Sequence, residues 1–340
     1  MEIATQALTS IVIARAARKR LPQYGTAILA ASAIAPDLDY ASYFGGASAF
    51  LRFNRTLLHS IPSAAALACA IAAGFWWLAR KRSQTRRSDA PFTLASALAA
   101  AALGISVHLL LDLASGTGAR LLWPFSQRWS AWDLAANLDP WILILLAAGL
   151  LLPLLFRLVS EEIGDRKRAT RGRGGAILTL ALLATYLAAR ASLHSRAVEL
   201  LLSRDYHART PLAAGAFPSA SSPFVWRGVV TTDNTIEEVE VSLAAGAEFD
   251  PEHSLTRYKP DDSPALAAAQ NTAVTKGFLS YARFPLASVV RREETYRFEV
   301  HDARFASGDT SAANMFVRVE LSSDLKIQKE ELLFAGSPNP

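Results

Sequence analysis

The chain has 340 residues, 51% of them hydrophobic, and its mean hydropathy of +0.20 is high for a soluble protein. Its net charge of +5 is uneven, because the first 200 residues carry 21 Lys and Arg against 11 Asp and Glu, whereas the rest carries 14 against 19. The basic excess therefore reflects membrane topology and gives no sign of nucleic-acid binding, while a single cysteine, Cys69, excludes disulfides within the chain and a thiolate zinc cage.

Six apolar segments predict an α-helical membrane domain of five to six helices over residues 1–200. They lie at 3–17, 23–36, 61–79, 92–114, 140–158 and 175–193. Basic clusters separate the first segment from the second, the third from the fourth and the fifth from the sixth. The positive-inside rule places these three loops in the cytoplasm, so residues 37–60, residues 115–139 and everything after about 194 are expected outside.

Ionisable side chains gather at the predicted outer ends of these segments. Asp37 and Asp39 follow the second segment, where Pro36 should end the helix and leave an extended chain. His59 precedes the third segment. His108 and Asp112 lie in the last two turns of the fourth, four residues apart and hence on one helix face. Taken alone, that pair suits metal or proton chemistry and a polar contact between helices about equally.

Two imidazoles and three carboxylates at one membrane depth suit Zn²⁺, Mn²⁺ or Fe²⁺, with a position left for water. His59, His108 and Asp112 are the first expected ligands. Asp37 and Asp39 would complete the ligand set, form a second metal site, act as a general base or orient a histidine. Arg55, four residues before His59, would bind a phosphate or carboxylate of a substrate, or else lie at the membrane interface with its charge in water.

Several motifs occur in a fixed order along residues 1–130: Pro36-Asp37-Leu38-Asp39, Arg55 to His59-Ser60, His108 to Asp112, and Trp123-Pro124-Phe125. This order resembles the bacterial membrane-bound metal-dependent hydrolase family, also described as LexA-binding, inner-membrane-associated hydrolases. The resemblance implies a hydrolase with a metal site built from these motifs. Gln6 stands where that family has an early histidine, and Asn54 where it has the first histidine of a His-Arg motif. Amide oxygens bind transition metals far more weakly than imidazole does.

The pattern changes to alternation after about residue 210, which predicts a small β-rich (α+β) soluble domain over 223–340 behind a Pro- and Ser-rich linker at 201–222. Strands are expected at 224–230, 239–243, 278–284, 296–300, 315–321 and 325–329, and a helix at 261–273. By the loop charges, this domain lies outside the cytoplasm.

The sequence therefore predicts an integral-membrane metal-dependent hydrolase in the bacterial cytoplasmic membrane. Its substrate would be a phosphoester or ester of a lipid or envelope molecule, and membrane lipids would surround it. The alternative is a non-catalytic membrane protein that binds a partner and keeps a structural or degenerate metal site, a reading that Gln6 and Asn54 favour. A transporter with a His/Asp proton relay fits less well, because the polar residues gather at one face of the membrane. No protein partner can be named from the sequence.

Overall fold

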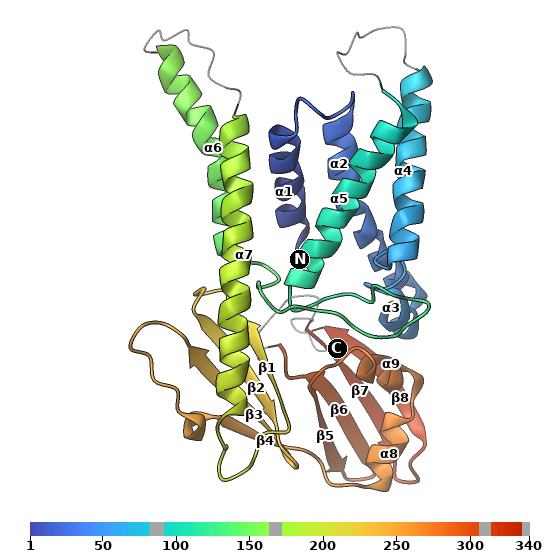
Figure 1. The fold of residues 1–340 in the computed structure, drawn as a ribbon. Helices are drawn as coiled ribbons and strands as arrows, with labels where there is room; N and C mark the ends of the chain where they lie inside the picture. Colours follow the sequence, from blue (N-terminus) through green and yellow to red (C-terminus); the bar gives the residue numbers. More distant parts are fainter. Residues whose placement is uncertain (82–91, 163–171, 306–313, 335–340) are drawn as a thin grey trace. The chain divides into compact units, whose positions relative to one another are not determined.

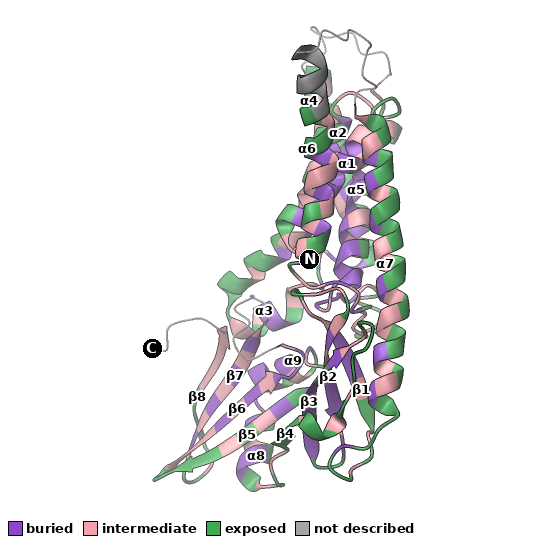
Figure 2. Cartoon of the chain, turned by 90° about the vertical axis from the view of Figure 1, so that its left-hand side faces the viewer, coloured by how far each residue is buried: buried purple, intermediate pink, exposed green. Residues whose placement is uncertain are grey.

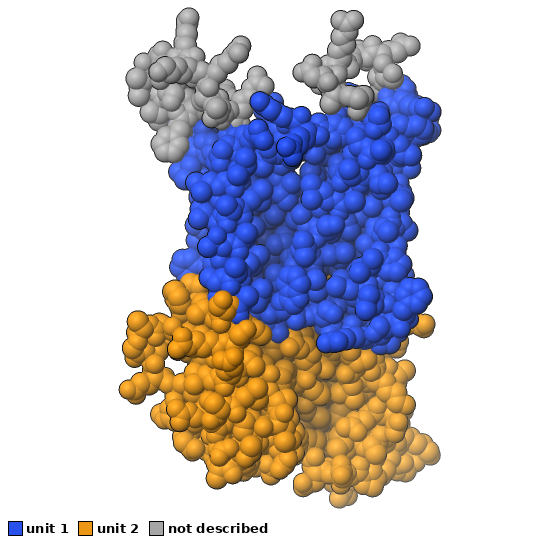
Figure 3. Space-filling view, in the orientation of Figure 1, with its two compact units in different colours: residues 1–39, 55–191 blue, residues 40–54, 192–340 orange. Residues whose placement is uncertain are grey.

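The computed structural model describes residues 1–81, 92–162, 172–305 and 314–334. Contacts divide the chain into two compact units, coloured separately in Figure 3. The first unit comprises residues 1–39 and 55–191, and the second comprises 40–54 and 192–340. The division assigns the short segment 40–54, which lies between two helical parts of the sequence, to the same unit as the C-terminal strands.

Helices build the first unit (Figure 1). They are α1 (Ile3–Ala16), α2 (Gly25–Ile34), α4 (Ile61–Lys81), α5 (Leu94–Ala114), α6 (Pro140–Glu162) and α7 (Arg173–Leu202), the last of which continues into the second unit. All six coincide with predicted segments. Within the described ranges, α4, α5 and α7 are long and apolar enough to cross a membrane, and α1 is a shorter apolar helix. The orientation relative to the cytoplasm stays a prediction.

Helix α5 is the most enclosed of these three candidate spans. The structure buries 39% of its apolar window, against 17% for α4 and 22% for α7 (Figure 2). Small residues allow this packing, since a Cβ on Gly104 would lie 2.6 Å from the Leu29 carbonyl oxygen and 2.8 Å from Ser32 Cβ in α2. On another side of α5, Ala97, Ala100 and Ala101 pack in one cluster with the alanines of α4. Polar side chains near the end of α5 are therefore held among helices.

The segment after α2 differs from its prediction. Instead of an extended chain, residues Ala35–Gly45 form a 3-10 helix, η1, and Ala47–Phe53 form a short helix, α3. Pro36 fits the beginning of a helical turn because its missing N–H is not needed there. Asp37 and Asp39 consequently project from a compact turn, and the prediction of extended backbone at these two residues is wrong.

Two four-stranded antiparallel sheets form most of the second unit, with sequential strand orders β1-β2-β3-β4 and β5-β6-β7-β8. The strands are β1 (Ala213–Pro218), β2 (Val225–Thr231), β3 (Thr235–Ser242), β4 (Leu255–Tyr258), β5 (Pro285–Arg292), β6 (Thr295–Asp302), β7 (Met315–Ser322) and β8 (Ile327–Phe334). Helices α8 (Pro264–Gln270) and α9 (Ala273–Leu279) lie between the two sheets in sequence, and η2 (Pro251–His253) precedes β4. In the first sheet, Trp226 and Val230 pack in one core with Ala197 and Leu201 of α7.

The predicted β-rich C-terminal domain is present and consists of two antiparallel sheets. Several of its segments differ from expectation, and no strand was expected at β4 or β5. The strand expected at 278–284 is wrong, because Phe278 lies buried in α9, whose first turn is capped by Thr272 accepting from the Thr275 N–H. Strand β1 lies inside the stretch predicted as a linker, where its backbone pairs with β2 from Ala213 opposite Thr231 to Pro218 opposite Trp226. Alanine and glycine there carry little apolar periodicity, which hides the strand from the sequence.

Candidate metal centre

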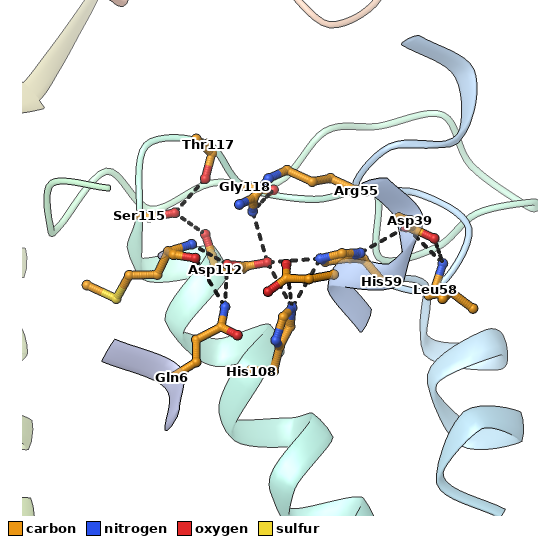
Figure 4. Close-up of polar contacts among 12 residues, drawn as sticks. Gln6, Asp39, Arg55, Leu58, His59, His108, Asp112, Ser115, Thr117 and Gly118 are labelled. Atoms are coloured by element: carbon orange, nitrogen blue, oxygen red, sulfur yellow. Dashed lines mark hydrogen bonds and ion pairs between the residues drawn. The ribbon is translucent and has the colours of Figure 1, made fainter. Parts of the chain in front are cut away.

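Four side chains of the helical unit converge at the end of α5 (Figure 4). The two histidine Nε2 atoms, of His59 and His108, lie 3.1 Å apart. Asp112 Oδ2 lies 3.1 Å from His59 Nε2 and 3.3 Å from His108 Nε2. Asp37 Oδ1 lies 3.8 Å from His108 Nε2, and Asp37, His59 and His108 each offer one ligand atom within 4.8 Å of the other two.

Local structure explains how these residues meet. His108 and Asp112 are one turn apart on α5, and both side chains are fully buried. His59 lies just before α4 in a turn anchored by a hydrogen bond from the Ile61 N–H to the Leu121 carbonyl. Asp37 comes from η1 and is the most accessible of the four, with a side chain 14% exposed. Three segments distant in sequence thus contribute to one buried polar cluster.

The hydrogen bonds made by the two Nδ1 atoms determine whether the two Nε2 atoms carry a hydrogen or a lone pair. His108 Nδ1 lies 2.7 Å from the Ala33 carbonyl oxygen, which only accepts, so this nitrogen carries a hydrogen. His59 Nδ1 lies 3.0 Å from a carboxylate oxygen of Asp39 and also donates. In neutral imidazoles, both Nε2 atoms then present lone pairs to each other at 3.1 Å. Such an arrangement needs a cation between the two rings, either a proton or a metal ion.

The groups around His59 favour its protonated form while no metal is bound. Burial opposes its charged form, but hydrogen bonds with Asp112 and Asp39 outweigh burial and raise the pKa of His59 above its ordinary value. Because transition metals bind neutral imidazole, an incoming ion would replace this proton.

The donor set fits a divalent ion. Ligand atoms around a tetrahedral zinc ion, with bonds of about 2.0–2.1 Å, are separated by about 3.3 Å. The two separations from Asp112 Oδ2 to the imidazoles and the separation between the imidazoles span 3.1–3.3 Å. Two imidazole nitrogens with carboxylate oxygens are also the ligand types that Zn²⁺, Mn²⁺ and Fe²⁺ accept. Asp37, His59 and His108 therefore form a buried group that could hold a metal ion.

Asp39 lies on the outer side of His59, away from the converging atoms (Figure 4). Its carboxylate accepts hydrogen bonds from the Leu58 N–H at 2.9 Å and 3.0 Å and from the Thr56 N–H at 3.2 Å, besides the contact with His59 Nδ1. A carboxylate engaged in this way fixes the ring orientation and tautomer of a ligating histidine. Among the roles that the sequence left open for Asp39, this geometry matches the orienting one.

Arg55 reaches the cluster from the turn before α4. Its Nη1 lies 2.9 Å from Asp112 Oδ2 and 3.5 Å from the Gly118 carbonyl oxygen. The backbone of Arg55 has a φ of 54°, a left-handed conformation that is uncommon for residues other than glycine. Its carbonyl accepts from the Arg120 N–H at 3.2 Å. These contacts hold the arginine beside the cluster.

The two departures from the family pattern lie in different units. Gln6 of α1 is fully buried beside the cluster, with its Nε2 3.3 Å from Asp112 Oδ1. Its Oε1 has no hydrogen-bond partner among the described residues. Asn54 falls in the second unit, outside the helical unit that contains the cluster. Gln6 therefore contributes an amide nitrogen to the surroundings of Asp112.

Two main-chain contacts of the cluster have no counterpart in the sequence reasoning. The Ala33 carbonyl sets the tautomer of His108, and the α-amino group of Met1 pairs with Asp112 Oδ1. Both come from main-chain atoms, which no residue type reveals. In the sequence, Gly104 is a signal that could have pointed to the Ala33 contact, because a glycine in an apolar helix allows another helix to approach closely.

Comparison with known proteins gives one finding. The family model described as YdjM inner membrane protein matches residues 1–197, a range that contains every residue of the cluster. No curated protein and no solved structure matches the chain. The matched range covers more than half of the chain. It includes the candidate membrane helices α4 and α5 in full and most of α7. The chain therefore belongs to the YdjM inner membrane protein family.

Proposed function

We propose that this protein is an integral-membrane, metal-dependent hydrolase whose divalent ion is held by His59, His108, Asp112 and Asp37. The observation that carries the proposal is the pair of imidazole Nε2 atoms 3.1 Å apart, each with its Nδ1 hydrogen already donated elsewhere. A buried arrangement of lone pairs and carboxylates is costly unless a cation compensates it. Zn²⁺, Mn²⁺ and Fe²⁺ all suit these ligands.

The chain's own residues divide the work. When bound, a divalent ion supplies a Lewis acid and a nucleophilic water at neutral pH. His59 and His108 bring their Nε2 atoms within 3.1 Å of each other. Asp39 and the Ala33 carbonyl hold the two rings in this orientation through hydrogen bonds with Nδ1. Asp37 Oδ2 has no hydrogen-bond partner within the described part of the chain, so it is available to accept a proton from water.

The substrate class follows from position and is part of the proposal. Loop charges place the ends of α2 and α5 that carry the cluster at the outer side of the cytoplasmic membrane. A site at that depth would meet lipids and envelope molecules, so we expect hydrolysis of an ester or phosphoester in such a molecule. Membership in an inner membrane protein family supports the inner-membrane location, and the side of the membrane rests on the loop charges alone.

A second candidate function is a membrane protein that binds a partner and uses the ion structurally. Gln6 favours it, because a glutamine amide occupies the position beside Asp112 where related proteins would offer another imidazole. Metal binding without hydrolysis of any ester or phosphoester reporter would select this candidate.

Metal analysis of the purified full-length protein tests the proposal. We expect about one tightly bound divalent ion per chain in the wild type and almost none in His108→Ala. His253→Ala is the matched control, since His253 is 85% exposed and lies in the second unit, and it should retain the wild-type content. Loss of hydrolysis on chelation, with recovery on adding metal, would complete the case. Equal and negligible metal in the wild type and His108→Ala would overturn the proposal.

A further inference from the structure

We infer that Arg55 exchanges partners: it neutralises Asp112 while the metal site holds no metal, and binds a phosphoryl group once a metal ion occupies the site. This inference rests on the proposed metal centre and narrows its substrate to a phosphoester. The ester group of a carboxylic ester is neutral and offers a guanidinium no charge to bind, whereas a phosphoester carries anionic oxygens that suit it.

Asp112 Oδ2 is the atom at issue. It is fully buried and lies within 3.3 Å of three groups: the Nε2 atoms of His59 and His108, and Nη1 of Arg55. Arg55 brings a permanent positive charge to this oxygen, since arginine stays protonated in proteins. A buried carboxylate without a cationic partner is unfavourable, so Arg55 on Oδ2, together with the α-amino group of Met1 on Oδ1, stabilises Asp112 without metal.

A divalent ion held by the same imidazoles would change this balance. Asp112 Oδ2 lies 3.1 Å and 3.3 Å from the two Nε2 atoms, which lie 3.1 Å apart, so an ion bound to the imidazoles would also contact this oxygen. The carboxylate would then gain two positive charges at bonding distance, and its pairing with the guanidinium would lose much of its value. The positive charge of Arg55 would become available beside the ion.

Arg55 is also placed to serve as a ligand-binding group. Its side chain is 12% exposed, whereas the side chains of His59, His108 and Asp112 are 0–1% exposed. Figure 4 shows Arg55 approaching Asp112 from the side of the loop at Thr117 and Gly118, with His108 on the other side. A molecule that approaches the cluster from the side of that loop would meet the guanidinium before it meets the metal-ligating side chains.

The backbone around Arg55 fixes this position. A left-handed φ of 54° is strained for a residue other than glycine and persists only where surrounding contacts hold it. Two contacts come from the 118–120 turn: the Gly118 carbonyl and the Arg120 N–H. Gly118 itself has a φ of 62°, and a Cβ there would lie 2.2 Å from the Ser130 carbonyl oxygen, so the turn requires glycine. Such strain is typical of a group held for binding and is not needed for a surface ion pair.

Coupled binding of zinc and phosphate tests the inference. Calorimetric titration would use the full-length protein in detergent, with Zn²⁺ and inorganic phosphate as probes. We expect zinc-loaded wild type to bind phosphate at least about tenfold more tightly than metal-free wild type, a typical size for coupling between two ligands. Arg55→Met should still bind zinc, which also shows that it is folded, but should lose the increase in phosphate affinity. Arg55→Lys should keep part of it, because lysine keeps the charge without the bidentate geometry.

Further measurements distinguish a failure of the Arg55 inference from a failure of the proposed metal site. Arg128→Met removes an exposed arginine of the 115–139 loop and should behave as wild type. Competition by short-chain phosphatidic acid would assign the phosphoryl group to a lipid, and phosphate binding without such competition would assign it to a water-soluble phosphoester. Equal phosphate affinity with and without zinc, or an unchanged increase in Arg55→Met, would overturn the inference while leaving the metal site intact. Absence of zinc binding in the wild type would overturn the proposed function itself.

Discussion

Each unit of this protein buries an aspartate against an arginine, and the two aspartates differ in how their oxygens are used. In the β-rich unit, Asp302 accepts hydrogen bonds from the Arg283, Phe284 and Arg304 N–H groups and from Arg304 Nε, at 2.7–3.3 Å. Each of its oxygens is therefore engaged by donors. In the helical unit, Asp112 Oδ2 faces Arg55 together with two imidazole nitrogens that carry lone pairs when neutral.

The difference separates structure from function. A buried carboxylate whose two oxygens both accept hydrogen bonds is compensated for the loss of water and stabilises the fold. A buried carboxylate that also faces the lone pairs of neutral imidazoles leaves a place for a further cation. By this comparison, Asp302 and Arg304 form a structural pair, whereas the surroundings of Asp112 fit the proposed metal site.

The largest effect on stability is expected from Asp302→Ala. Removing this carboxylate takes away the ion partner of Arg304 Nε, whose side chain is 1% exposed, which should cost about 3–5 kcal/mol of unfolding free energy. Denaturant unfolding followed by the fluorescence of Trp226, a buried residue of the same unit, would measure it. The zinc content of the folded protein should not change. A loss of zinc with unchanged stability would reverse the roles assigned to the two aspartates.

Asp39→Asn should weaken the metal site without unfolding the protein. The amide can still accept from the Leu58 N–H but loses the negative charge that orients and polarises His59. Loss of such an orienting partner typically lowers metal affinity about 10–100-fold. Competition with a chelator of known affinity would measure it, with Asp324→Asn, an exposed aspartate of the second unit, as the control. Unchanged zinc affinity in Asp39→Asn would show that His59 needs no carboxylate partner.

Gly104→Ala tests whether helix packing positions the ligands. The added Cβ would approach the Leu29 carbonyl oxygen to 2.6 Å, so α2 and α5 must separate at a cost of about 1–3 kcal/mol. Separation would lengthen the bond from His108 Nδ1 to the Ala33 carbonyl and should reduce zinc affinity severalfold. Thermal unfolding and zinc titration of the same preparation check both effects. Gly74→Ala, where a Cβ meets no atom within 4 Å, should leave both unchanged.

The smallest effect concerns pH and the β-rich unit. Burial lowers the pKa of His301 below its ordinary value of 6.5, so its folded form resists protonation. As pH falls through about 6.5, the unfolded chain takes up a proton that the folded chain resists, and the unfolding free energy decreases. Above that pH the histidine is neutral in both states and contributes no slope. Unfolding at about pH 5.5 and 7.5 should differ less in His301→Gln than in the wild type. An identical pH dependence would remove His301 as the cause.

The sequence predicted the helical part of the fold well because its apolar segments are long. All six expected helices are present, and the i,i+4 spacing correctly placed His108 and Asp112 on one face of α5. Loop charge placed Asp37 and His59 at the same depth, and the structure brings both to His108. Long periodic patterns and residue types were enough for these conclusions.

What the sequence did not reveal depends on contacts between distant segments. Asp39 resembles Asp37 in the sequence, and only the turn at Thr56 and Leu58 shows that its carboxylate faces outward from His59. The Ala33 carbonyl acts through the main chain, which carries no mark of its role. In the second unit, Phe278 lies in a helix capped at its first turn, although its residue type favours a strand. Strand β1 has too few β-branched residues to be recognised from the sequence.

X-ray absorption spectroscopy of the zinc-loaded full-length protein tests the central claim most directly. The account predicts two imidazole nitrogens at about 2.0–2.1 Å, with oxygen ligands completing the shell and no sulfur. In His108→Ala, any zinc that remains should show one imidazole at most. A spectrum without imidazole scattering, or one unchanged by His108→Ala, would contradict a metal centre built on His59 and His108.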